Sequence, residues 1–367
     1  MKTFDDRALN RARLHRQWLT ERRDATPLET MEHLVGMQGQ LGDPPYFQLW
    51  SRLNDFTTDD LSTLLEDRRA VRVVLMRGTI HLVSARDALT LRTLVQPYLS
   101  KTVFNGSEYG KRIQGVDPEA LVEAGRRLLA DKPLHVDELG AGLAEQFDGY
   151  AGGDLAYGLR GLMPLIQTPP RGVWGQGGGL TYASTGQWLG ADPDTDWDAA
   201  LDAAIPRYLA AYGPATIQDF QTWSSLTRTA PAFARLRDRL IVHRDAAGRE
   251  LYDLPDIELP DLDGPLKPLL LGGFDNILLS HREREFVISK PAQKKVFRQN
   301  AMMKGTILID GLVVGTWFTT LKKKTALLTF EPFESLSAKN RRYLEGEGER
   351  LLDFAAGTAE TRTVEFT

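Results

Sequence analysis

The spacing of hydrophobic residues changes several times along the 367-residue chain. Apolar positions at near-helical intervals predict an amphipathic helix over residues 5–24 and two shorter helices over 46–53 and 57–66. Residues 71–83 are β-branched and apolar, which predicts strands, and a further helix is expected over 84–97. Helices followed by such a β element indicate a winged helix.

The same order of elements recurs twice. In the second set, residues 133–147 and 154–166 predict helices, and residues 171–189 predict a hairpin with two aromatic segments around a triple-glycine turn. In the third set, helices are expected over 198–212, 216–226 and 230–240, with Thr216 as an N-cap, and a hairpin is expected over 240–254. The glycine-rich stretch lacks the spacing of a phosphate-binding loop, so a turn is the better interpretation.

The last part of the chain is mostly strand. A proline- and acid-rich linker is expected over 255–268. Strands are predicted over 269–271, 286–289, 305–317 and 326–330, with an Asp310-Gly311 hairpin turn, and a closing helix over 337–355. These strands predict a small barrel or a curled sheet.

A chain of this length is expected to form more than one hydrophobic core. The pattern predicts an α+β fold with three tandem winged-helix units followed by a C-terminal small β-barrel-like domain. The expected boundaries are 1–115, 116–195, 196–262 and 263–367.

Composition narrows the class of protein. The chain is 42% hydrophobic and 26% charged, without an apolar run long enough to cross a bilayer and without a secretory signal at its start, which predicts a cytoplasmic protein. The absence of cysteine excludes disulfides and thiolate metal sites, and six scattered histidines do not form a metal motif. We therefore expect neither a metal nor a cofactor.

Charge is distributed unevenly, although the formal net charge is only −4. Residues 282–345 hold thirteen Lys and Arg against six Asp and Glu, and residues 66–112 hold nine against four. Residues 245–263 hold seven acids against one arginine. The two basic segments predict a groove for nucleic acid if the fold brings them together; otherwise they are solvated surface.

The candidate chemistry lies at Gln38 and Gln40. Three glycines and the Asp43-Pro44-Pro45 sequence predict that the preceding helix ends near Gly36, so the two glutamines lie on an extended segment and share one side. Carboxamides donate and accept hydrogen bonds but take up no proton at neutral pH, so the pair can hold a water molecule without acting as a strong base. The alternative is that both amides only satisfy backbone groups at a helix end.

Several segments together resemble the bacterial winged-helix DNA glycosylases that excise alkylated bases. The resemblance spans nearly the whole chain and depends on five segments: His33–Leu41, Met76–Val83, Gly213–Trp223, Leu271–Asp275 and Asp310–Trp317. It implies three winged-helix units and a C-terminal β domain around a basic concave channel for duplex DNA.

The resemblance also implies the reaction. The catalytic pair of this family is a glutamine followed two residues later by Gln or Asp, which corresponds to Gln38 and Gln40 here. The family usually has an apolar residue between them; this chain has Gly39, which is expected to loosen the local backbone. The expected activity is that of a monofunctional glycosylase that hydrolyses the N-glycosidic bond of N7-alkylguanine in duplex DNA. Interstrand crosslinks made by a natural-product alkylating agent are a further expected substrate.

A cationic N7-alkylguanine leaves as a neutral base, so two amides that position water can suffice, whereas ordinary purines should be spared. Asp43 or Asp275 could assist, although Asp43 could equally cap the turn before Pro44. Binding of a monomer to DNA is expected to weaken steeply with salt. The residues expected to contact DNA are Arg77, Lys294, Lys295, Arg298, Lys322, Lys323 and Lys324.

Two other functions fit the same pattern. Tandem winged helices are common in non-enzymatic transcription regulators, which bind one undamaged sequence tightly. A resistance protein that sequesters the free alkylating compound would bind it without DNA.

Overall fold

The computed structural model describes residues 2–257, 264–297, 304–322 and 324–367. The fold is mixed α+β. Within the described residues, the chain up to residue 189 forms ten helices: α1 (Asp6–Arg16), α2 (Pro27–His33), α3 (Pro44–Trp50), α4 (Thr58–Glu66), α5 (Ala85–Thr102), α6 (Glu108–Arg112), α7 (Pro118–Leu128), α8 (Val136–Ala144), α9 (Gly152–Leu162) and α10 (Thr185–Leu189). The described residues of the second half add α11 (Trp197–Tyr212), α12 (Ile217–Ser224), α13 (Ala230–Arg235), α14 (Asn276–Leu279), α15 (Lys290–Val296) and α16 (Ala338–Ala356).

Three sheets organise these helices. The first has the order β2 (Met37–Gln38), β4 (Ile80–Ser84), β3 (Ala70–Val74), β6 (Leu165–Gln167), β7 (Thr181–Ser184) and β5 (Leu134–His135). The second consists of β1 (Thr3–Phe4), β8 (Ile241–Asp245) and β9 (Glu250–Asp253). The third has the order β10 (Leu269–Leu271), β11 (Gly305–Ile309), β12 (Leu312–Leu321), β13 (Thr325–Pro332) and β14 (Thr361–Phe366).

Local residue chemistry explains where several elements begin. The Ser84 hydroxyl accepts a hydrogen bond from the backbone N–H of Asp87 and so caps α5. Thr216 and Asp219 form a capping box at the start of α12, which confirms the predicted N-cap. Asp310 and Gly311 both have positive φ in the turn between β11 and β12, as a two-residue hairpin requires, so this predicted turn is also confirmed.

The six-stranded sheet crosses the expected boundary between residues 115 and 116. β3 pairs with β4 in the first unit and with β6 in the second, so the two predicted wings form one continuous sheet. The predicted hairpin over 171–189 is wrong in its first half: only β7 is a strand, and it pairs with β6 and β5. The glycine-rich stretch is part of the connection between β6 and β7 rather than a tight turn.

The predicted barrel is wrong. In the described residues the C-terminal sheet is open, with β10 and β14 at its two edges. β14 was not predicted; it pairs in parallel with β13 after the crossover helix α16. Residues 286–289 are not a strand, although the Val287 carbonyl accepts a hydrogen bond from Val313 N at 2.9 Å. Part of the predicted linker, residues 258–263, lies outside the described residues.

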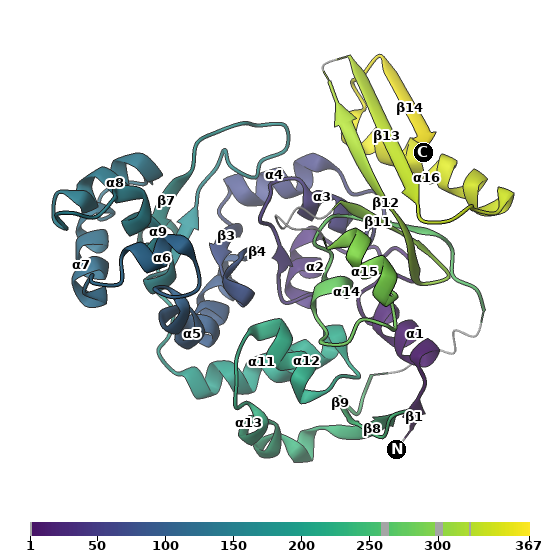
Figure 1. The fold of residues 1–367 in the computed structure, drawn as a ribbon, viewed down its shortest axis with the longest axis horizontal. Coiled ribbons are helices and arrows are strands. Elements are labelled where there is room, and N and C mark those ends of the chain that lie inside the picture. The colour runs from purple at the N-terminus through teal and green to yellow at the C-terminus, as the bar shows by residue number, and fades with distance from the viewer. Residues whose placement is uncertain (1, 258–263, 298–303, 323) are drawn as a thin grey trace.

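The predicted first unit lies between the other parts of the molecule. Figure 1 shows α7–α9 at one end of the long axis and β12–β14 with α16 at the other, with α2–α4 and β3–β4 between them. One hydrophobic core joins the first unit to the C-terminal sheet, because Met31, Leu34 and Trp50 belong to the same buried cluster as Trp317 and Phe330. No helix of the described residues is long and apolar enough to cross a membrane.

Candidate active site

The segment that carries the two glutamines is extended, as predicted. α2 ends at His33, and Val35 and Gly36 follow with φ of 50° and 92°, which turns the chain into β2. A side chain at Gly36 would bring its Cβ within 2.7 Å of Val83 Cγ1, so only glycine fits this turn. β2 then pairs with β4, and Gln38 lies opposite His81.

Both glutamines bind the hairpin formed by β3 and β4. Gln38 Oε1 accepts a hydrogen bond from Arg77 Nη2 at 2.9 Å, and Gln40 Oε1 accepts one from the backbone N–H of Ile80 at 3.1 Å. Because Arg77 and a backbone N–H can only donate, these partners fix which side of each carboxamide is the oxygen. Each oxygen keeps a second lone pair for another hydrogen bond.

The alternative interpretation of the glutamines holds only in part. Gln40 does satisfy a backbone N–H, but that N–H belongs to the β3–β4 hairpin rather than to the end of α2. Gln38 binds a side chain instead. Gln38 is 7% exposed, whereas Gln40 is exposed and precedes Leu41, which is 45% exposed. Gln38 is therefore buried, and only Gln40 faces solvent.

Gly39 does not loosen the segment as expected. Its N–H donates to the Ile80 carbonyl at 2.8 Å, which keeps the backbone in the ladder with β4. A Cβ at this position would lie 3.3 Å from both Arg72 Nη1 and Pro45 Cγ. The Arg72 guanidinium, which donates to the Leu41 carbonyl at 3.3 Å, occupies the space that a side chain at position 39 would need.

His81 and Arg77 lie next to Gln38. His81 Nδ1 lies 3.1 Å from the Thr79 carbonyl and must carry the proton, so Nε2 accepts a hydrogen bond from Arg77 Nη2 at 3.3 Å. Burial, and then the charge of Arg77, lowers the pKa of His81 to about 3. Burial lowers the pKa of Arg77 to about 10. At neutral pH the imidazole is therefore neutral and the guanidinium is charged.

Three residues that support the site were not identified from the sequence. Gln48 Nε2 donates to the carbonyls of Gly273 at 2.9 Å and Gln38 at 3.4 Å. Asn276 Nδ2 donates to the Gly36 carbonyl at 2.8 Å, and the Tyr212 hydroxyl donates to the Leu34 carbonyl. Gln48 is near Gln38 in the chain, but Asn276 and Tyr212 are far from the residues that they contact. No local sequence pattern could have revealed the contacts of these two residues.

The two candidate carboxylates have different surroundings. Both oxygens of Asp275 accept hydrogen bonds from Arg52, at 2.7 and 2.8 Å, and both side chains are fully buried. Asp275 is therefore occupied by an ion pair. Asp43 precedes α3 but its side chain makes no capping hydrogen bond, so its predicted role as a cap is wrong. Neighbouring atoms desolvate its carboxyl group and raise its pKa, and the charge of Arg72 opposes this shift.

The basic residues expected to contact DNA fall into two groups. Arg77 lies in the site itself, bound to Gln38. Lysines of the C-terminal part are exposed on α15 and beside the β12–β13 turn: Lys294, Lys295, Lys322 and Lys324. Lys324 forms an ion pair of 2.8 Å with Glu360. Arg298 and Lys323 lie outside the described residues.

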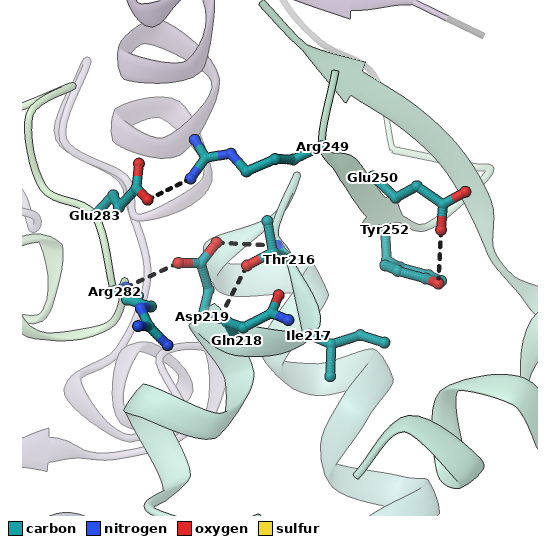
Figure 2. Close-up of a pocket in the computed structure, with 9 residues that line it drawn as sticks. All are labelled: Thr216, Ile217, Gln218, Asp219, Arg249, Glu250, Tyr252, Arg282 and Glu283. Atoms are coloured by element: carbon teal, nitrogen blue, oxygen red, sulfur yellow. Dashed lines mark hydrogen bonds and ion pairs between the residues drawn. The ribbon is translucent and has the colours of Figure 1, made fainter. Parts of the chain in front are cut away.

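A cavity of about 600 Å³ lies elsewhere, at the N-terminal end of α12. Figure 2 shows that Asp219 in its wall is held by Thr216 and by the backbone of Arg282. The Arg249 guanidinium in the same wall is paired with Glu283. Neither Gln38 nor Gln40 lines this cavity.

A catalytic role of Gln38 and Gln40 would make the reaction independent of pH. Neither glutamine titrates, and His81 and Arg77 keep their charge states between about pH 5 and about pH 9. A catalytic base at Asp43 would instead lose activity as the pH falls through the raised pKa of that carboxyl group. For the base excision that the family resemblance implies, we expect single-turnover rates, corrected for spontaneous base loss, to be flat over this range. Asp43→Asn should retain the wild-type rate, and an acidic limb that this variant abolishes would contradict the interpretation.

Comparisons with known proteins agree with this architecture. A family model described as "DNA glycosylase AlkZ-like" matches residues 31–354. The chain is 28% identical over 331 residues to the interstrand DNA cross-link repair glycosylase of Streptomyces sahachiroi. The aligned residues cover 83% of this chain and 85% of that protein. The solved structure of the Streptomyces sahachiroi DNA glycosylase AlkZ matches with a TM-score of 0.82 and 24% identity, covering 100% of both chains. That structural likeness concerns the fold.

Proposed function

Because the chain belongs to the AlkZ-like DNA glycosylase family, we propose that it hydrolyses the N-glycosidic bond of N7-alkylguanine in duplex DNA at Gln38 and Gln40. Water attacks C1′ of the deoxyribose while the C1′–N9 bond breaks and its electron pair moves to N9. The cationic base leaves as neutral 7-alkylguanine, and the proton of the attacking water passes to solvent. No protein group has to protonate the leaving base.

The observation that carries the proposal is the arrangement of the two carboxamides. Both oxygens face donors of one short stretch, Arg77 to Ile80, and each retains a lone pair that can accept a hydrogen bond from water. Holding the water in the orientation for attack supplies catalysis without a strong base, since positioning alone lowers a barrier substantially. The neutral pair also suits a substrate whose leaving group is already activated.

The exposure of the site favours bulky lesions. Gln40 faces solvent and Leu41 beside it is 45% exposed, so a base need not swing into a deep pocket to reach Gln40. A crosslinked base cannot leave the duplex completely, because its partner strand holds it. The name of the Streptomyces sahachiroi relative specifies interstrand cross-link repair. Unhooking of interstrand crosslinks is accordingly included in the proposed activity.

DNA binding is assigned to a concave channel between three winged-helix units and the C-terminal sheet. Support for winged helices comes from the antiparallel strand pairs β3–β4, β6–β7 and β8–β9, each of which follows a group of helices. Exposed lysines on α15 and beside the β12–β13 turn supply cations for phosphates. The protein acts on this duplex as a monomer.

Excision from a defined duplex tests the function directly. We expect release of 7-methylguanine from a duplex with one N7-methylguanine, and no release of guanine from the matched undamaged duplex. Binding should favour the damaged duplex. A transcription regulator would instead bind one undamaged sequence tightly and release no base, and that result would overturn the proposal.

A further inference from the structure

Arg77 lies in the turn that joins β3 to β4, where the sequence suggested a phosphate contact. We infer that Arg77 is instead a positioning residue, which fixes the carboxamide of Gln38 in the orientation that the reaction needs. The inference rests on the proposed function of Gln38. It assigns Arg77 a role through another side chain, without contact to the DNA backbone.

The guanidinium has three partners on three different segments. Nη2 donates to Gln38 Oε1 at 2.9 Å and approaches His81 Nε2 at 3.3 Å, and Nη1 donates to the Trp223 carbonyl at 3.0 Å. The planar fork of an arginine can direct two nitrogens to different acceptors at once, whereas a lysine offers one compact charge. The Trp223 contact therefore sets the direction in which Nη2 meets Gln38.

The contact to α12 uses a carbonyl that helices leave unsatisfied. Trp223 lies in the last turn of α12, and the following Ser225 has φ of 64°, which ends the helix. Carbonyls in a last turn lack an intrahelical donor and carry partial negative charge, so they attract a cation. The Arg77 side chain thus connects the Trp223 carbonyl at the end of α12 to the carboxamide of Gln38.

The backbone at Arg77 is strained in a way that suits this role. Arg77 has φ of 58°, and Gly78 after it has φ of 68°. A left-handed conformation is unfavourable for a non-glycine residue, so surrounding contacts must maintain it. The strained residue is thus the one whose guanidinium donates to the side-chain oxygen of Gln38.

The inference also explains how the amide is presented. Because Oε1 of Gln38 faces a donor, the NH₂ group of the same amide must face away from Arg77. Without the guanidinium the amide could turn over and exchange its oxygen and nitrogen. A water molecule held by the second lone pair of Oε1 would then lose its acceptor.

Two substitutions separate positioning from phosphate binding. Arg77→Lys keeps a charge but not the fork, and Arg77→Met removes the charge. We expect both to slow single-turnover excision of N7-methylguanine about 100-fold, as small misplacements of reacting groups do. DNA affinity, and the dependence of log affinity on log salt, should stay at wild-type values in both. Melting temperature and DNA binding verify that each variant is folded.

A double-mutant cycle completes the test. If Arg77 acts through Gln38, then Gln38→Ala combined with Arg77→Lys should be no slower than Gln38→Ala alone. Wild-type excision by Arg77→Lys, or a salt slope reduced by about one in Arg77→Met, would overturn the inference while leaving the proposed function intact. Wild-type excision by Gln38→Ala would overturn both.

Discussion

Gln40→Ala is expected to slow single-turnover excision of N7-methylguanine about 100-fold, comparable to the loss of one oriented hydrogen-bonding group in other active sites. The Gln40 side chain is exposed, so water can take the place of the lost oxygen beside the Ile80 N–H. The stability of this variant should therefore stay near that of wild type. The loss of activity would then report chemistry rather than folding.

Gln38→Ala is expected to slow excision to the same extent, but it also leaves one N–H of the half-buried Arg77 guanidinium without its acceptor. An unsatisfied buried group costs about 1 to 3 kcal/mol, so this variant should unfold at a lower denaturant concentration. The double variant should be no more than slightly slower than either single variant, since groups that act as a unit are not additive.

Gln218→Ala is the matched control, because Gln218 is an exposed glutamine on α12 that contacts neither amide. It should excise at the wild-type rate. Excision would be measured with enzyme in excess over a duplex with one N7-methylguanine, after DNA binding of each variant is verified. Undiminished excision by both Gln38→Ala and Gln40→Ala would remove the pair from the mechanism.

Features governed by neighbouring residues could be predicted from the sequence. The end of α2 before Gly36 and the Asp310-Gly311 turn depend on backbone conformations that few residues adopt, and the structure has both. The capping box of Thr216 and Asp219 is also local in sequence. Such features can be predicted from the sequence because all of the residues that interact in them lie within a few positions of one another.

The missed features depend on contacts between distant segments. Asn276 reaches Gly36 across 240 positions, and Arg77 reaches Trp223 across 146. β14 is mostly exposed and has few apolar residues, so its sequence lacks the alternation that predicts a strand. Whether the sheet closes depends on pairing between its edge strands β10 and β14, which local propensity does not determine.

Asp275→Asn is expected to lower the free energy of unfolding by about 3 to 5 kcal/mol, because it leaves the charge of Arg52 buried without its counter-ion. Both side chains are fully buried, and Arg52 also donates to the carbonyls of Gln17 and Gln48. The pair therefore joins α1, α3 and the start of α14. Asp202→Asn is the control: its ion pair with Arg235 is partly exposed and should contribute no more than about 1 kcal/mol.

Denaturant unfolding of Asp275→Asn and Asp202→Asn measures the difference in their free energies of unfolding. Excision by Asp275→Asn then shows whether Asp275 only balances the charge of Arg52 or also takes part in the chemistry. If the carboxylate only balances Arg52, then Asp275→Asn should lose stability, and its folded fraction at low temperature should still excise the lesion. Its effect on excision should resemble that of other destabilising changes and rise with temperature. A variant with wild-type stability and no excision would instead identify Asp275 as part of the chemistry, because an ion pair with no catalytic role cannot produce that combination.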